Sequence, residues 1–176
     1  MSFDKDTYRT PPYFVNWLRR RQGWWHNWID GCASEDNAVF ESYIGNGVMA
    51  LFPDFLDFNP LSIVAEFTDE DIAYFVNPPY SNPLPFVKRA AELKQQGYLV
   101  VMLLPADKST KWYGVIQQHA TEVIDIIGGR INFLDPDGNE VKGNNKGSMV
   151  AVFDPYMQGF ITRQVELDFV KQCGEA

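Results

Sequence analysis

The chain has 176 residues, of which 45% are hydrophobic and 15% aromatic, and its formal net charge is −8. Length and composition favour one globular domain spanning residues 1–176, without a separate target-recognition domain. They argue against a membrane protein, since no apolar run approaches the roughly 20 residues of a membrane span and no signal-peptide pattern opens the chain. Two cysteines and the lack of a Cys/His cluster argue against a disulfide framework or a metal site, and they favour a cytoplasmic location.

The negative charge is unevenly distributed along the chain. Residues 22–80 contain ten Asp or Glu and no Lys or Arg, whereas residues 1–21 contain five basic side chains and residues 81–146 contain eight. These basic side chains either approach the phosphates of a nucleic acid or are ordinary solvated charges. If only a few of them reach phosphates, binding to nucleic acid is weak and salt-sensitive.

The first predicted elements are a helix and a strand. Thr10 as N-cap and Pro11 at the first helical position predict a helix that ends at Gly23. The aromatic segment 24–30 predicts a strand that ends at Asp30. Small residues follow this aspartate, which would allow a ligand to approach the backbone closely.

The next part of the chain is harder to assign. Ser34 would cap a short helix, with Asn37 three residues later. Residues 43–67 contain glycine and proline turns without a clear period, and the acidic turn 68–71 follows them.

An apolar run at 72–76 predicts a buried strand that delivers a stiff loop, Asn77-Pro78-Pro79-Tyr80. Proline fixes its own φ and restricts the residue before it, so the loop should hold one shape. A stiff turn at the carboxyl end of a buried strand is where open α/β folds place ligands.

This loop suits the methylation of an exocyclic amine on a nucleobase. Such an amine is a poor nucleophile because its lone pair is delocalised, and two acceptors gripping its two N–H groups would free the lone pair. The Asn77 side-chain carbonyl and the Pro78 backbone carbonyl are the candidate acceptors, and Tyr80 offers a face on which a flipped base can stack. A proline-rich surface turn is the alternative interpretation.

Beyond the loop, the pattern predicts alternating helices and strands. An amphipathic helix at 86–94, closed by Gly97, precedes a continuous apolar strand at 98–104, which makes a βαβ unit with the strand at 72–76 and favours a parallel sheet. A second loop, 105–110, would then emerge beside the first. The remaining predictions are a helix at 112–119, strands at 122–127, 129–133 and 148–153, and a long mobile hairpin loop before the last strand.

In this order, the motifs resemble those of the small phage-type, Dam-like DNA adenine methyltransferases, which use S-adenosylmethionine and have a Rossmann-like fold. The resemblance covers residues 8–154. It rests on Thr10-Pro11, Asp30 to Ser34 with Asn37-Ala38, Asn77 to Asn82, Leu104 to Asp107 with Ser109-Thr110, and Gly129 to Ile131 with Phe133. It implies an α/β fold with a mostly parallel twisted sheet and a terminal antiparallel hairpin.

The resemblance also implies roles for individual residues. Asn77, Pro78, Pro79 and Tyr80 would bind and activate the target amine. The implied cofactor pocket is lined by Thr10, Pro11, Asp30, Gly31, Cys32, Ala33 and Asp57. The implied DNA contacts are Ser81, Asn82, Lys108, Ser109, Arg130, Lys142 and Lys146.

Several of these side chains have a second interpretation. Asp57 either binds the ribose or the adenine edge of the cofactor or is a solvated loop carboxylate. Asp54 is a second candidate for the same cofactor contact. Cys32 is expected to be a small side chain beside the cofactor, since direct methyl transfer uses no covalent enzyme intermediate. His26 and His119 lie in no motif and are expected to be structural or exposed.

We therefore expect an adenine-specific DNA methyltransferase that uses S-adenosylmethionine and no metal. It would methylate DNA with low sequence selectivity or at a short target sequence. It would act in a bacterial cell that hosts a phage or prophage. A protein glutamine methyltransferase is the first alternative, because a carboxamide presents the same two N–H groups. An inactive binding module that keeps the fold is the second.

Overall fold

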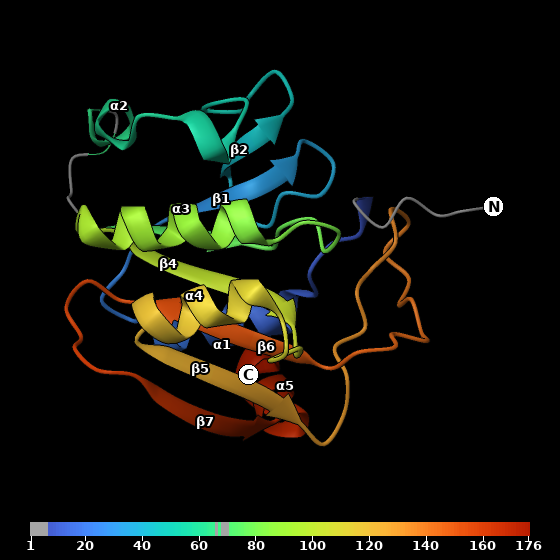
Figure 1. Cartoon of the computed structure of the whole chain (residues 1–176). Helices are drawn as coiled ribbons and strands as arrows, with labels where there is room; N and C mark the ends of the chain where they lie inside the picture. The colour runs from blue at the N-terminus through green and yellow to red at the C-terminus, as the bar shows by residue number, and fades with distance from the viewer. Residues whose placement is uncertain (1–6, 66, 68–70) are drawn as a thin grey trace.

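A seven-stranded β-sheet with helices on both faces forms the described part of the chain (Figure 1). The computed structural model describes residues 7–65, 67 and 71–176. The strands are β1 (Asn27–Ser34), β2 (Ser42–Asn46), β3 (Ile72–Val76), β4 (Leu99–Pro105), β5 (Glu122–Ile127), β6 (Ser148–Phe153) and β7 (Ile161–Glu166). The helices are α1 (Pro12–Arg21), the 3-10 helix η2 (Phe55–Asp57), α2 (Pro60–Val64), α3 (Leu84–Gln95), α4 (Lys111–His119) and α5 (Leu167–Glu175).

The sheet is parallel except at β6. Its strands lie in the order β2-β1-β3-β4-β6-β5-β7, and β6 runs antiparallel to both of its neighbours. The predicted α/β class, with a mostly parallel sheet and an antiparallel hairpin, is confirmed. The β5–β6 hairpin does not form the edge of the sheet, because β7, which was not predicted, pairs in parallel with β5.

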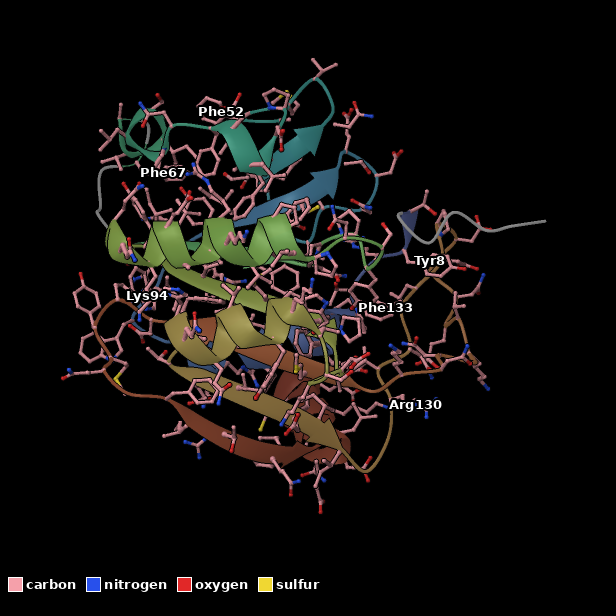
Figure 2. All side chains as sticks on the ribbon, viewed as in Figure 1. Tyr8, Phe52, Phe67, Lys94, Arg130 and Phe133 are labelled. Atoms are coloured by element: carbon pink, nitrogen blue, oxygen red, sulfur yellow. The ribbon has the colours of Figure 1, made fainter. Side chains whose placement is uncertain are left out.

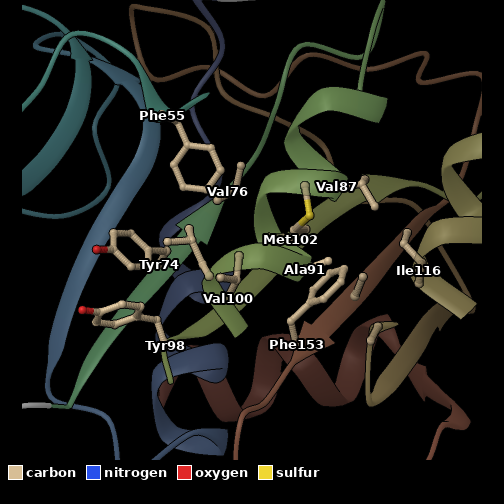
Figure 3. Close-up of a cluster of buried hydrophobic side chains, with 14 of the residues drawn as sticks. Phe55, Tyr74, Val76, Val87, Ala91, Tyr98, Val100, Met102, Ile116 and Phe153 are labelled. Carbon is tan, nitrogen blue, oxygen red and sulfur yellow. The ribbon is translucent and has the colours of Figure 1, made fainter. Parts of the chain in front are cut away.

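Each face of the sheet has its own hydrophobic core. Tyr74 and Val76 of β3 pack under α3 and α4, where Figure 3 shows them, whereas Ala73 and Phe75 pack under α1 and α5. All five residues of β3 are buried. Helices on both faces explain why the run at 72–76 is continuously apolar rather than alternating.

The predicted helices after β3 are confirmed. Gly97 follows α3 with φ +96°, a left-handed conformation that glycine adopts without strain. The Thr110 hydroxyl caps α4 by accepting the backbone N–H of Tyr113 at 3.2 Å. β3 and β4 pair in parallel, as the predicted βαβ unit requires.

Two predictions near the N-terminus need correction. The first helix begins at Pro12 with Pro11 as its N-cap, so Thr10 is not the cap. The Thr10 hydroxyl instead accepts a hydrogen bond from Asn77. The first strand does not end at Asp30 but continues to Ser34, with an irregularity in its pairing to β2 between Asp30 and Ala33.

The predicted helix at 34–38 is a turn. The Asn37 side chain accepts the backbone N–H of Ser34 at 2.7 Å, and the Ala38 N–H reaches the Ser34 carbonyl at 3.0 Å. Asparagine here closes a local turn, which competes with helix formation. The unassigned stretch 43–67 contains most of β2, together with η2 and α2, and the acidic turn 68–71 lies, apart from Asp71, outside the described residues.

The predicted strand at 129–133 is also wrong. Gly128 has φ +74°, and a Cβ on Gly129 would lie 2.7 Å from a Leu167 methyl carbon. These residues turn the chain away from the sheet rather than extend it. Beyond them, Leu134 forms isolated bridges to Arg9 and to Glu140.

Candidate active site

A cavity of about 550 Å³ lies at the carboxyl ends of β1, β3 and β4. Its walls are Tyr8, Thr10, Asp30, Cys32, Asn37, Val39, Phe75, Asn77, Pro78, Pro79, Tyr80, Pro105, Phe133 and residues 141–148. The predicted site residues that it brings together are Thr10, Asp30, Cys32, Asn77, Pro78, Pro79, Tyr80, Lys142 and Lys146. Open α/β sheets bind ligands at this end of their strands.

The Asn77 loop forms one wall of this cavity. The Asn77 side-chain amide donates from Nδ2 to the Thr10 hydroxyl oxygen at 3.3 Å. Within residues 7–65, 67 and 71–176, no hydrogen bond engages the Asn77 side-chain oxygen or the Pro78 carbonyl. The loop therefore keeps two acceptors available for a ligand with two N–H groups.

Tyr80 ends this loop and meets an aromatic side chain from a distant segment. The rings of Tyr80 and Phe133 lie edge to face, with centroids 6.4 Å apart. Tyr80 is 40% exposed, so part of its surface stays free to contact a ligand. Desolvation of its hydroxyl raises the Tyr80 pKa further above the physiological range, in which a phenol is neutral already.

Asp30 places a buried carboxylate on the cavity wall. Its two oxygens accept the backbone N–H groups of Cys32 at 3.2 Å and Val39 at 3.1 Å. Only 3% of Asp30 is exposed. Desolvation raises its pKa to about 6, although the two backbone hydrogen bonds and the charge of Arg9 act in the opposite direction. A cationic ligand group beside this carboxylate would compensate for its burial.

The small residues after Asp30 differ in their surroundings. A Cβ on Gly31 would lie 2.9 Å from the Phe55 ring and 2.9 Å from a Val76 methyl carbon, so glycine is required here by core packing. Cys32 lines the cavity and is partly buried, whereas Gly31 and Ala33 are not part of its wall.

Two further predicted cofactor residues lie away from the cavity wall. Asp57 is exposed at the end of η2, and Pro11 is buried at the start of α1. Asp54, the alternative to Asp57, accepts the backbone N–H of Leu56 at 2.9 Å. The roles suggested for these residues remain predictions.

Most of the predicted DNA contacts are engaged with other protein groups. Lys108 pairs with Asp125 at 2.7 Å and Lys146 pairs with Asp107 at 2.8 Å. Hydrogen bonds from Lys146 and Ser109 lower the Asp107 pKa to about 2, so this carboxylate is ionised at any pH near neutrality. Arg130 donates to the backbone carbonyl of Asn144.

Lys142 differs from these cations. It is exposed at the cavity wall, and none of the described residues pairs with its ammonium group. Ser81 and Asn82 are exposed beyond Tyr80, outside the wall. Among the three predicted lysine contacts, Lys142 is therefore the one that a phosphate could reach without first displacing a carboxylate.

The cavity wall also contains residues that were not predicted as site residues, among them Tyr8, Phe133 and residues 143–145. Tyr8 and Phe133 lie at the same side of the molecule, where the loops gather (Figure 2). The Arg9 N–H reaches the Leu134 carbonyl at 2.8 Å, and the Leu134 N–H returns to the Arg9 carbonyl at 2.9 Å. This pairing joins the segments that carry Tyr8 and Phe133, and no local pattern indicates it.

The histidines and tryptophans lie outside the cavity. His26 binds Asp71 at 2.7 Å, and the His119 carbonyl accepts a hydrogen bond from Lys94 at 2.9 Å. Trp25 and Trp28 are buried in the core under α1, whereas Trp24 is 89% exposed. These three tryptophans therefore do not contribute to the cavity wall.

The described residues contain neither a metal-binding cluster nor a membrane-spanning helix. Over the described ranges, no three His, Cys, Asp or Glu side chains gather in a metal-binding arrangement. None of the described helices is long and apolar enough to span a membrane. A second hollow, an open groove of about 950 Å³ between α1, β7 and α5, contains Trp17, Arg163 and Phe169 but none of the predicted site residues.

Comparison with known proteins identifies a family. The family model for DNA N-6-adenine-methyltransferase (Dam) matches residues 1–175. A protein of Escherichia phage T1 with the name DNA N-6-adenine-methyltransferase is 29% identical over 184 residues, which cover 96% of this chain and 71% of the relative. A protein of the same name from Haemophilus phage HP1 is 32% identical over 154 residues, or 86% of this chain and 80% of the relative.

Proposed function

We propose that this chain, which belongs to the DNA N-6-adenine-methyltransferase family, transfers a methyl group from S-adenosylmethionine to the exocyclic amine of adenine in DNA. The observation that carries the proposal is the state of the Asn77 loop. Its side-chain amide nitrogen is held by Thr10, and its two acceptors, Asn77 Oδ1 and the Pro78 carbonyl, are unengaged at the cavity. Two acceptors on one stiff loop match the two N–H groups of an adenine amine.

The two acceptors would act on the adenine amine before it attacks. Hydrogen bonds from both N–H groups draw the nitrogen away from planarity, which returns its lone pair from the ring to the nitrogen. S-adenosylmethionine, when bound, supplies a methyl group on a sulfonium that leaves as a neutral thioether. The amine loses its proton to solvent only after the new N–C bond has formed, so the loop needs no general base. Catalysis then depends mainly on proximity and on preorganised acceptors.

Tyr80 would provide the surface on which the target base stacks. An adenine inside a duplex cannot reach a cavity wall, so the base has to leave its stack. The exposed part of the Tyr80 ring lies on the same loop as the two acceptors. Stacking on this ring would place the plane of the base, while Asn77 and Pro78 would fix its amine.

Asp30 and Cys32 are the residues proposed to hold the cofactor. The residues fit S-adenosylmethionine, because a buried carboxylate at the cavity wall suits a ligand that carries an ammonium and a sulfonium. A positive ligand group next to Asp30 would relieve the desolvation that raises its pKa.

DNA binding is proposed to be weak and salt-sensitive. The net charge is −8, and two of the candidate lysines are paired with carboxylates. Phosphates would have to compete with Asp107 and Asp125 for Lys146 and Lys108. The protein would act inside a bacterial cell that carries the phage or prophage, on a short or loosely defined target sequence.

The alternatives receive less support. A glutamine carboxamide would fit the same acceptors, but both relatives carry names that specify adenine in DNA. The inactive-module alternative predicts no cofactor binding, which calorimetry can measure directly.

A transfer assay tests the proposal. The purified protein is incubated with S-adenosylmethionine labelled in its methyl group and with unmethylated DNA or a glutamine-containing protein fraction. We expect label in N6-methyladenine after digestion of the DNA to nucleosides. Label in cytosine, or in protein alone, would contradict the proposal. Sequencing of methylated positions in DNA from cells that express the protein would then define the target.

A further inference from the structure

We infer that Thr10 is a positioning residue, which holds the Asn77 carboxamide so that its oxygen faces the cavity. This inference rests on the proposed function and deepens it. It makes the chemistry of the Asn77 loop depend on a side chain that lies outside the loop and 67 positions away in the sequence.

The contact between the two side chains is specific and shielded. Asn77 Nδ2 lies 3.3 Å from the Thr10 hydroxyl oxygen, and both residues line the cavity. Thr10 is only 3% exposed, so water has little access to its side of the pair. A hydrogen bond of this kind is strongest where water cannot replace either partner.

Thr10 is itself fixed from both sides. The preceding residue, Arg9, exchanges two backbone hydrogen bonds with Leu134, and the following residue, Pro11, is the N-cap of α1. α1 is anchored in the core by Phe14, which has no exposed surface. A β-branched side chain such as threonine has few χ1 choices, so the hydroxyl has a defined position.

The orientation of the carboxamide decides what it can do. With Nδ2 bound to Thr10, the remaining acceptor is the oxygen, and an adenine amine can donate to it. After a 180° rotation about the last side-chain torsion, an NH2 group would face the N–H groups of the amine, and donor would meet donor. The Thr10 hydroxyl can accept from the NH2 group or donate to the oxygen, so its contribution is to fix the position of the carboxamide; with Nδ2 bound, as in the structure, the oxygen is the atom left for the amine.

This role differs from the direct cofactor contact that the family resemblance suggests for Thr10. A residue that only binds cofactor affects its affinity, whereas a residue that positions Asn77 affects turnover with cofactor bound. The two roles are distinguishable by measuring cofactor dissociation and turnover separately.

Thr10→Val removes the hydroxyl and keeps the shape of the side chain. We expect kcat at saturating S-adenosylmethionine and DNA to fall about tenfold, the effect of one lost hydrogen bond, while the cofactor Kd changes less than twofold. Thr10→Ser keeps the hydroxyl and should restore most of kcat. Thr10→Ala replaces the valine variant if that one does not fold.

A second buried threonine provides the matched control. Thr121 is 6% exposed and its hydroxyl donates to the Val152 carbonyl at 3.0 Å, outside the cavity wall. Thr121→Val should lower stability through the same kind of loss but leave kcat unchanged. An unchanged kcat with a raised cofactor Kd in Thr10→Val would overturn the inference and leave Thr10 as a cofactor contact.

A measurement without turnover keeps this test separate from the proposed function. The side-chain NH2 protons of Asn77, assigned in NMR spectra by their loss in Asn77→Ala, should exchange slowly with water in the wild type and faster in Thr10→Val. Equal exchange in both proteins would overturn the inference. If the wild type transfers no methyl group to adenine, the proposed function fails, but the exchange experiment still reports whether Thr10 holds the amide.

Discussion

At the scale of single residues, Asp30 and Asn77 give the cavity two groups that suit different parts of its ligands. Asp30 is a carboxylate that burial has moved toward its neutral form, and Asn77 is an amide with its oxygen left unengaged. The first suits a positive ligand group and the second suits an N–H donor. Both depend on backbone or side-chain partners from other segments, so neither role follows from the residue type alone.

The raised pKa of Asp30 predicts how cofactor binding depends on pH. The ionised carboxylate attracts a cation, and a pKa of about 6 means that it becomes protonated as the pH falls through 6 rather than through 4. We expect the affinity for S-adenosylmethionine, measured by calorimetry, to decrease below pH 6. In Asp30→Asn the affinity should be lower at pH 7.5 and nearly independent of pH.

The same shift has the opposite sign for the stability of the ligand-free protein. Because the folded-state pKa lies above the ordinary value of 3.8, the folded protein binds this proton more tightly than the unfolded chain. The stabilising contribution is therefore complete below pH 4 and is lost as the pH rises through 6.

A cofactor affinity that does not change between pH 7.5 and pH 5 would contradict a role for Asp30.

Asn77→Ala tests the role of the Asn77 side-chain oxygen as a hydrogen-bond acceptor. This variant loses one of the two groups that would hold the amine, and we expect kcat to fall by at least about 100-fold, as for removal of one preorganised catalytic hydrogen-bonding group. Calorimetry should give a cofactor Kd within twofold of the wild type. Asn82→Ala, on the same loop but exposed, should change only the KM for DNA. Loss of cofactor binding in Asn77→Ala would mean that the residue is structural.

At the scale of elements, two helical glycines have opposite surroundings. Gly114 lies within α4, and an added Cβ would meet open space. Gly174 lies near the end of α5, and its Cβ would stand 1.8 Å from the backbone carbonyl oxygen of Tyr13 in α1. The crossing of α1 and α5 is thus close enough to require glycine.

These surroundings predict substitutions of opposite sign. Gly114→Ala should raise the free energy of unfolding by about 0.5–1 kcal/mol, because alanine favours the helix and meets no obstacle. Gly174→Ala should lower it by about 1–3 kcal/mol, because the backbone of α1 has to move. Urea denaturation followed by circular dichroism measures both, and equal effects of the two substitutions would contradict the described crossing.

The sequence predicted those elements whose pattern is local. Three elements are recognisable in the sequence because their apolar residues follow the burial pattern of the element. They are the strand at 72–76, the helix closed by Gly97 and the strand β4. The turn at 34–38 was predicted as a helix because Ser34 and Asn37 have the spacing of a cap, and only the bond from the Ser34 N–H to the Asn37 side chain distinguishes the two. β7 escaped prediction because five of its six residues, all except Val165, are exposed and lack a period.

The site followed the same rule. Asn77 to Tyr80 were predictable from their own sequence, since proline stiffness and the amide are visible in four consecutive residues. The hydroxyl of Thr10 was assigned to helix capping, because the partner it meets lies 67 positions away. Phe133 was placed in a strand that does not form, because the segment pairs with Arg9 rather than with the sheet.

At the scale of the whole molecule, an acidic protein has to bind a polyanion. Lys142 is exposed at the cavity wall, whereas Lys108 and Lys146 pair with carboxylates. The first phosphate contact should therefore fall on Lys142, with the other lysines recruited only when DNA displaces their partners. Binding should weaken steeply as salt is added.

Lys142→Ala tests this distribution. We expect this variant to bind DNA more weakly. The slope of log K against log salt concentration should be smaller by about one phosphate contact. Fluorescence anisotropy between about 50 and 200 mM salt measures both quantities. Lys88→Ala, an exposed lysine on α3 outside the cavity wall, is the control and should change neither quantity. Identical salt dependence in wild type and Lys142→Ala would assign the contact elsewhere.

The packing of α1 against α5 has a consequence for how the protein matures. Asn16 of α1 donates to the Gly174 carbonyl at 3.1 Å, and Phe14 shares a core with Val170. Because α5 follows every other described element in the chain, the apolar side of α1 lacks this cover until α5 has been synthesised. Since α1 follows directly on Thr10, we expect the nascent chain to remain unable to modify DNA until its late helix has docked.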